Sequence, residues 1–195
     1  MNAGDDFAAL VRSVRACTLC AGLPLGPKPI VQLSRRAKIL IAGQAPGRIT
    51  HHKGIPFDDP SGIRLRKWMG ITNDQFYDAG KIAILPMSFC FPGTGKSGDL
   101  PPRPECAPAW RENILSQMPD IELTLVIGKY AIDWHIPGDK KMSLAQSVKS
   151  GTGRSAGLFP MPHPSPRNNR WLKVNPWFEA YTIPLLQTRI RALMA

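Results

Sequence analysis

Two short segments carry residue types that suit a binding or catalytic site. The first consists of Gly43, Gln44, Ala45, Pro46 and Gly47. It comes directly after an apolar run. Its glycines let the backbone approach a ligand closely, and free N–H groups in such a turn bind an anion or a carbonyl oxygen. The same residues also suit an ordinary turn between a strand and a helix.

The second segment is rich in proline and in hydrogen-bonding side chains. It consists of His163, Pro164, Ser165, Pro166, Arg167 and Asn168, with Arg170 close behind. The prolines stiffen the loop, and the histidine can donate a hydrogen bond. The serine, arginine and asparagine suit contacts with phosphates or with a DNA groove. A proline-rich surface turn with a solvated histidine would have the same composition.

The cysteines are the other residues with chemistry of their own. They are Cys17, Cys20, Cys90 and Cys106. They would suit disulfides in a secreted protein, but the N-terminal segment is acidic and lacks the basic start and apolar stretch of a signal peptide. No apolar run approaches the ~18 residues that span a membrane, so we expect a soluble cytoplasmic protein. In a reducing cytosol the thiols indicate metal binding or inert burial.

The charge balance favours a polyanionic partner. Lysine and arginine outnumber aspartate and glutamate by 25 to 14, which gives a net charge of +11 and a pI near 9.9. A domain this basic is expected to bind nucleic acid. A solvated basic surface without a partner would have the same charge, and charge alone does not separate specific from non-specific binding.

The elements that must position these residues alternate along the chain. Short apolar runs that predict buried strands lie at residues 37–43, 82–89 and 123–128. Continuous apolar strands are typical of parallel sheets covered on both faces. Two long loops, residues 91–104 and 150–170, are rich in glycine, proline and basic residues. Loops at strand ends are where sites are usually built.

Helical patterns occupy the stretches between and beside the strands. They lie at residues 5–15, 61–70 and 177–193. We expect the last helix to start with Asn175 as its N-cap and to kink or break at Pro184. The alternation predicts an α/β sandwich with a mostly parallel sheet. We expect three layers, α/β/α, around a short four-stranded central sheet. The length suits one domain over residues 1–195.

Taken together, the two segments resemble the paired motifs of the uracil-DNA glycosylase superfamily. Members carry a first motif of the type GQDPY, GEAPG or GLAPA and a second of the type HPSPL near the C-terminal third. Here residues 43–47 read GQAPG and residues 163–167 read HPSPR. The resemblance covers nearly the whole chain. Residues 54–57 look like the family's GRPF or GRMF segment, and residues 90–93 and 103–106 look like its C-x-P-P-G and P-x-P-E segments.

The resemblance also implies a role for the cysteines. In the thermostable-type branches, families four and five, a Cys-x2-Cys pair precedes the first strand and two more cysteines flank the loop after the second strand. Together they hold a structural [4Fe–4S] cluster, and Cys17, Cys20, Cys90 and Cys106 match that arrangement. Four thiolates also suit structural zinc. The wide spacing of the second pair favours the cluster over zinc or unligated buried thiols.

Cleavage of the bond between uracil and deoxyribose needs three kinds of group. A carboxylate stabilises the oxocarbenium-like sugar and orients water, donors stabilise the departing uracil anion, and an aromatic face holds the flipped base. The resemblance implies that Phe57, otherwise interpreted as a core residue, stacks on uracil and that His163 hydrogen-bonds a uracil oxygen. Many members use a pocket asparagine, for which Ser88 is the nearest polar side chain here. That difference extends the expected range to other deaminated bases, such as hypoxanthine or xanthine.

The first motif lacks the catalytic acid that the resemblance calls for. Gln44 and Ala45 occupy the positions where GEAPG and GQDPY members carry it. The GLAPA branch uses an aspartate in a downstream segment of the form F-x-G-D-R-S-G. Alignment on its Ser-Gly pair places Asp59 in the catalytic position, with Asp58 as the second candidate. Alternatively, Asp59 only begins the helix that follows it.

The resemblance also implies a DNA-binding rim. Arg167 stands where relatives insert a leucine into the base stack, and an arginine there can fill the vacated space and contact phosphate. The other expected DNA contacts are Ser61, Ser165, Pro166, Asn168 and Arg170. A solvated loop is the alternative.

The sequence thus predicts a monomeric, monofunctional glycosylase of DNA base-excision repair that removes uracil from DNA. Two alternatives stay open. One is a non-catalytic or covalent-trapping uracil-DNA binding protein, because a related branch traps DNA through a histidine after its first motif, and His51 and His52 lie in roughly that region. The other is a basic iron–sulfur scaffold that binds DNA non-specifically.

Overall fold

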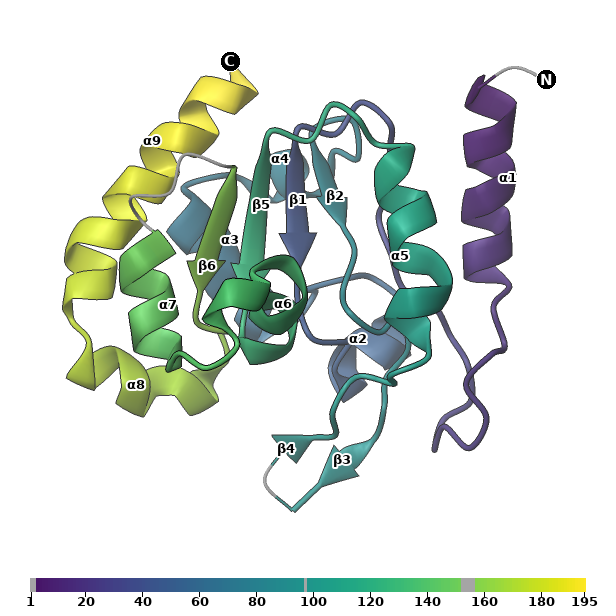
Figure 1. Ribbon diagram of the computed structural model, residues 1–195, viewed down its shortest axis with the longest axis horizontal. Helices are drawn as coiled ribbons and strands as arrows, with labels where there is room; N and C mark the ends of the chain where they lie inside the picture. Colours follow the sequence, from purple (N-terminus) through teal and green to yellow (C-terminus); the bar gives the residue numbers. More distant parts are fainter. Residues whose placement is uncertain (1–2, 97, 152–156) are drawn as a thin grey trace.

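A parallel sheet forms the centre of the computed structural model, which describes residues 3–96, 98–151 and 157–195. Its strands are β1 (Ile39–Ala42), β2 (Ile82–Ile84), β5 (Leu123–Ile127) and β6 (Leu158–Met161), in the order β2-β1-β5-β6. Each neighbouring pair is parallel. The predicted α/β fold with a parallel four-stranded sheet is confirmed (Figure 1).

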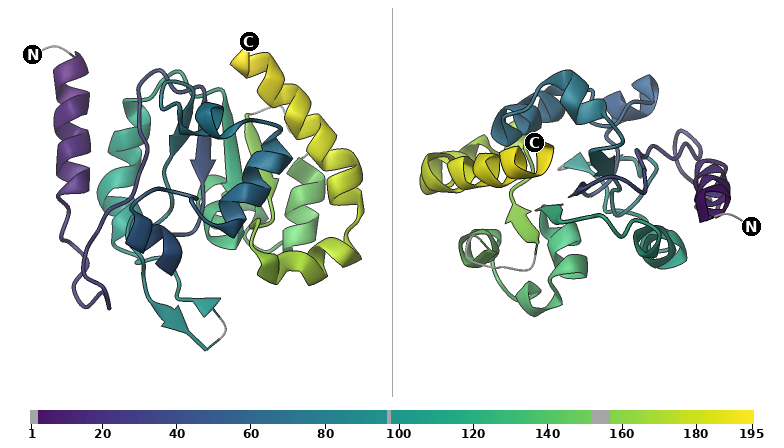
Figure 2. Two further views of the ribbon diagram at one scale, coloured as in Figure 1. Left: turned by 180° about the vertical axis from the view of Figure 1, so that it is seen from behind. Right: turned by 90° about the horizontal axis from the view of Figure 1, so that it is seen from above.

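Helices cover both faces of the sheet because successive strand residues point to opposite sides. Ile39 and Ile41 pack with α3 (Pro60–Met69) and α9 (Ile183–Met194). On the other face, Leu40 packs with α1 (Ala3–Arg15) and α5 (Cys106–Ser116). Figure 2 shows the sheet between these helices. Burial from both sides explains why the strands are continuously apolar in the sequence.

The remaining helices are short and lie in the connections. They are α2 (Arg48–Lys53), α4 (Asn73–Tyr77), α6 (Lys129–His135), α7 (Leu144–Gly151) and α8 (Asn169–Val174). Two 3-10 turns, Pro137–Asp139 and Pro166–Asn168, and a π turn, Phe178–Thr182, join them. None of the helices that the structure describes is long and apolar enough to cross a membrane.

Both segments that the sequence predicts as long loops contain strands. In the later one, β6 pairs Pro160 with Val126, and its position at the edge of the sheet tolerates a residue without an N–H group. Its sequence, Leu-Phe-Pro-Met, has no β-branched residue and therefore gave no strand signal. Residues 152–156 of that predicted loop lie outside the described residues. In the earlier loop, β3 (Thr94–Gly95) and β4 (Gly98–Asp99) form a short antiparallel hairpin.

The C-terminal helix begins differently from the prediction. The Asn175 side chain accepts a hydrogen bond from the indole of Trp177 at 3.1 Å and follows the end of α8, so its prediction as an N-cap is wrong. The π turn Phe178–Thr182 precedes α9, and Pro184 lies in the first turn of α9. The helical conformation is therefore continuous from the π turn through Pro184.

Candidate active site

A cavity of about 510 Å³ opens at the carboxyl ends of the parallel strands. The chain leaves β1 for β2 on one side and returns to β5 on the other, and open α/β sheets bind ligands at such a switch point. The two sequence motifs follow β1 and β6, so both reach this edge (Figure 1). The predicted site residues that line the cavity are residues 43–47, Phe57, Asp59, Ser61, His163, Ser165, Pro166, Arg167 and Asn168.

The first motif forms one wall through its backbone. The N–H groups of Met87 and Ser88 donate to the carbonyls of Gly43 and Gln44 at 2.8 and 3.0 Å, which fixes the turn after β1. The side-chain amide of Gln44 donates to the carbonyl of Leu100 at 2.9 Å. Gln44 therefore ties the motif to the chain that leaves the β3–β4 hairpin.

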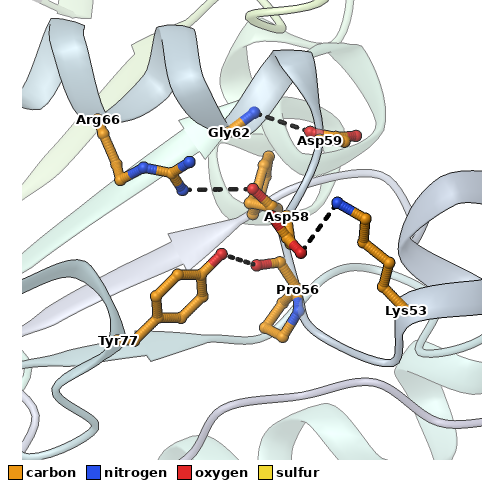
Figure 3. A network of polar contacts seen from close by, with 8 residues as sticks. Lys53, Pro56, Asp58, Asp59, Gly62, Arg66 and Tyr77 are labelled. Carbon is orange, nitrogen blue, oxygen red and sulfur yellow. Dashed lines mark hydrogen bonds and ion pairs between the residues drawn. The ribbon is translucent and has the colours of Figure 1, made fainter. Parts of the chain in front are cut away.

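Phe57 is held in an unusual backbone conformation beside this wall. It is the non-glycine residue with a positive φ, +56°, among those that the structure describes. Arg66 donates to the carbonyl of Phe57 at 3.3 Å, and the hydroxyl of Tyr77 donates to the carbonyl of Pro56 at 3.0 Å (Figure 3). A Cβ on Gly43 would lie 3.7 Å from the tip of the Phe57 ring. The loop is thus anchored from behind and presents the ring to the cavity.

The neighbouring aspartates point in different directions. Asp59 is the N-cap of α3, its Oδ1 accepts a hydrogen bond from the N–H of Gly62 at 2.8 Å, and it lines the cavity. Asp58 instead pairs with Lys53 at 3.0 Å and does not line the cavity (Figure 3). The helix-capping interpretation of Asp59 is therefore correct, and it is compatible with a carboxylate at the cavity wall.

His163 is oriented by its own loop. The N–H of Ser165 donates to Nδ1 at 3.1 Å, so the proton of the neutral ring lies on Nε2. Burial lowers the pKa of His163 most strongly, while Asp59 and Asp99 raise it and Arg167 lowers it, with a net decrease. The ring is therefore neutral at pH 7 and keeps one donor, Nε2–H, for a ligand. It lies nearly parallel to Phe57, with ring centroids 6.5 Å apart.

We expect the pKa of His163 to fall further in Asp59→Asn, because that substitution removes a carboxylate that stabilises the imidazolium. In the unchanged protein the pKa of the His163 ring lies below its ordinary value of 6.5. NMR titration of the ring signals, assigned with His163→Gln, measures both values. Asp58→Asn is the matched control and leaves the titration unchanged. A ring that titrates above pH 6.5 would contradict the neutral donor.

The second motif is braced against α3. Arg64 donates to the carbonyl of Ser165 at 3.3 Å, and the side chain of Asn168 donates to the carbonyl of His163 at 2.7 Å. The guanidinium of Arg167 lies against Gly98 of β4. Arg170 is exposed and does not line the cavity. These contacts join the motif to both α3 and the hairpin.

A family model described as the uracil DNA glycosylase superfamily matches residues 31–187. The chain belongs to this superfamily. The match spans both motifs and every cavity residue named above. Members of the superfamily are DNA glycosylases, which act on DNA.

Two residues, Ser88 and Asp99, differ from what the sequence predicted for the site. Ser88 is fully buried, does not line the cavity, and its hydroxyl has no hydrogen-bond partner among the described residues. Asp99, which the sequence did not indicate, lines the cavity from β4. No local signal could have found Asp99, because only the fold of the hairpin brings it beside the first motif.

The histidines considered for covalent trapping lie on α2, behind the first motif. His51 is buried against Phe91, with ring centroids 6.1 Å apart, and does not line the cavity. Lys28 donates to the carbonyl of His51 at 2.6 Å and holds the end of the helix. The His51 ring is thus directed into the protein, away from the space that a nucleotide would occupy.

The cysteines gather beside the loop that carries the hairpin. Cys20 and Cys90 pack together, and the indole of Trp110 donates to Cys17 at 3.3 Å. Burial, with a smaller contribution from neighbouring thiols, raises the pKa of Cys90 to about 11 and that of Cys106 to about 12. Within the described ranges, no group of three or more His, Cys, Asp or Glu residues is arranged to hold a metal ion.

Proposed function

We propose that the protein is a monofunctional uracil-DNA glycosylase of base-excision repair, which flips uracil out of DNA and hydrolyses its N-glycosidic bond. The observation that carries the proposal is the meeting of Phe57, Asp59 and a neutral His163 in one cavity. These are the aromatic face, the carboxylate and the donor that the reaction needs. The cavity volume of about 510 Å³ accommodates a nucleoside.

The proposed mechanism assigns one task to each group. The base stacks on Phe57 after it leaves the helix. His163 Nε2–H donates to a uracil oxygen while the bond from N1 to C1′ breaks and its electron pair stays on the base. Asp59 stabilises the positive sugar by its charge and orients the water whose oxygen then bonds to C1′.

The direct test uses labelled single- and double-stranded DNA with one uracil, followed by alkali. We expect alkali-labile breaks at the uracil and release of free base. Parallel substrates with hypoxanthine or xanthine measure the range of bases. A denaturant-resistant protein–DNA adduct would instead indicate covalent trapping, and binding without any product would indicate a non-catalytic protein. Either result overturns the proposal.

We also propose that Cys17, Cys20, Cys90 and Cys106 hold a [4Fe–4S] cluster. The supporting observations are that Cys20 and Cys90 pack together, that Cys106 is also buried, and that Trp110, on the helix that begins with Cys106, donates to Cys17. A cluster keeps its ligands farther apart than one ion does, so the lack of a single-ion site does not count against it. When bound, it would supply a structural link between the N-terminal segment and both ends of the loop 91–105.

Removal of one ligand tests the cluster. We expect the purified protein to show a broad visible absorbance and bound iron, both lost in Cys90→Ser, together with a lower melting temperature. Metal analysis of the same samples separates iron from zinc. Stoichiometric zinc, or a protein without any metal, would disprove the assignment.

Arg167→Ala is expected to weaken binding to DNA and to reduce the slope of log Kd against log salt by about 1, because one phosphate contact is lost. Arg167 is exposed at the cavity mouth, in the second motif. Arg191→Ala on α9 is the control, since Arg191 does not line the cavity. Equal slopes of log Kd against log salt in the two variants would show that Arg167 does not contact DNA.

A further inference from the structure

Asp99 brings a second carboxylate to the cavity. It is the last residue of β4 and lines the cavity together with Gly98. A Cβ on Gly47 would stand 3.4 Å from Asp99 Oδ2, so the carboxylate lies directly against the backbone of the first motif. The motif itself provides no acid, since it carries Gln44 and Ala45. The cavity thus gains an acid from a different part of the chain.

Contacts from both motifs hold the Asp99 segment in place. Asp99 pairs with Thr94 across the hairpin, and the next residue, Leu100, donates to the carbonyl of Gly93 at 2.8 Å. Gln44 donates to the carbonyl of Leu100 at 2.9 Å. On the other side, the guanidinium of Arg167 lies against Gly98. Asp99 is therefore fixed by its neighbours in the chain, although its own side chain is exposed.

The two cavity carboxylates differ in what they already bind. Asp59 uses Oδ1 to accept the N–H of Gly62 at 2.8 Å. The Asp99 carboxylate accepts no hydrogen bond and forms no ion pair within the part of the chain that the structure describes. Both charges reach the ring of His163, whose pKa each of them raises. The carboxylate of Asp99 is thus exposed to water, on the side of the cavity where its charge reaches His163.

We propose that Asp99 is the general base that accepts the proton of the attacking water. The proposal rests on the glycosylase function proposed above. The bond from C1′ to N1 breaks and leaves its electron pair on uracil, the water oxygen bonds to C1′, and the water proton passes to the Asp99 carboxylate. Asp59 then stabilises the sugar cation, and Gln44 acts as a positioning residue that holds the hairpin.

The alternative is a carboxylate at the rim that only repels DNA phosphates, and Asp99→Asn separates the two roles. As a general base, Asp99 is expected to contribute about 100-fold to the single-turnover rate. The variant should nevertheless bind DNA containing a non-cleavable uracil analogue as tightly as the unchanged protein, or more tightly, because a negative charge is removed. A rim carboxylate predicts equal or tighter binding with an unchanged rate.

Asp58→Asn is the matched control, since it removes the same charge from a residue that does not line the cavity. Formate should partly restore the rate of Asp99→Ala, because the exposed position admits a small carboxylate. A rate of Asp99→Asn equal to that of Asp58→Asn, or a loss explained entirely by weaker binding, would overturn the proposal. Absence of uracil release by the unchanged protein would instead overturn the glycosylase function itself.

Discussion

Asp59→Asn is expected to lower the single-turnover rate of uracil release by about 10³-fold without a change in stability. The carboxylate stabilises positive charge on the sugar, and loss of one well-placed electrostatic contact typically costs 10²–10³ in rate. Asparagine still caps a helix about as well as aspartate does, so the hydrogen bond to Gly62 at the start of α3 survives. The rate of base release at saturating enzyme and the urea unfolding midpoint measure the two effects separately.

Asp59→Ala completes the comparison. It should lose the same rate and also about 1 kcal/mol of unfolding free energy, because alanine cannot cap α3. Asp58→Asn should keep both the rate and the stability, since Asp58 forms an exposed ion pair with Lys53. If Asp59→Asn cleaves as fast as the unchanged protein, capping is the whole role of Asp59. The carboxylate of the reaction would then have to be Asp99.

The sequence was sufficient for the fold because its strands are buried on both faces. Continuous apolar runs identified β1, β2 and β5, and their alternation with helices implied the parallel sheet. β6 was not predicted, because a segment that contains Pro160 and no β-branched residue lacks the usual composition of a strand. It forms a strand because it pairs with β5. Tertiary contacts thus determine the secondary structure of β6, the strand with the weakest local sequence signal.

The candidate site was predictable where a residue follows a strand and unpredictable where it depends on long-range contacts. Phe57 and His163 lie in the cavity as their motifs indicated. Alignment favoured Asp59 but left Asp58 as a second candidate, since the segment is one residue shorter than the family pattern. The start of α3 separates them, because the N-cap side chain must turn toward the first helical N–H groups. Asp99 depends on the hairpin and had no sequence signal.

Gly62→Ala is expected to be the most damaging small substitution near the site. A Cβ on Gly62 would overlap the carbonyl oxygen of Phe57 and approach Cβ of Phe57 to 2.9 Å. Much of this clash is with backbone, so no side-chain rotation relieves it. Arg66 and Tyr77 anchor the same loop through the carbonyls of Phe57 and Pro56, and Phe57 already has a φ of +56°. The added methyl group must therefore displace either α3 or the loop.

Two measurements follow from that displacement. We expect a loss of about 3 kcal/mol of unfolding free energy in urea, in the upper range for an added group in a packed site. We also expect about a 10²-fold slower release of uracil by the molecules that remain folded, because a shift of about 1 Å in a positioned group has that effect. Gly138→Ala is the control, since a Cβ there meets nothing within 4 Å. Similar behaviour of the two variants would mean that Phe57 is not held by this contact. The Ser61–Gly62 pair would then serve only to begin α3.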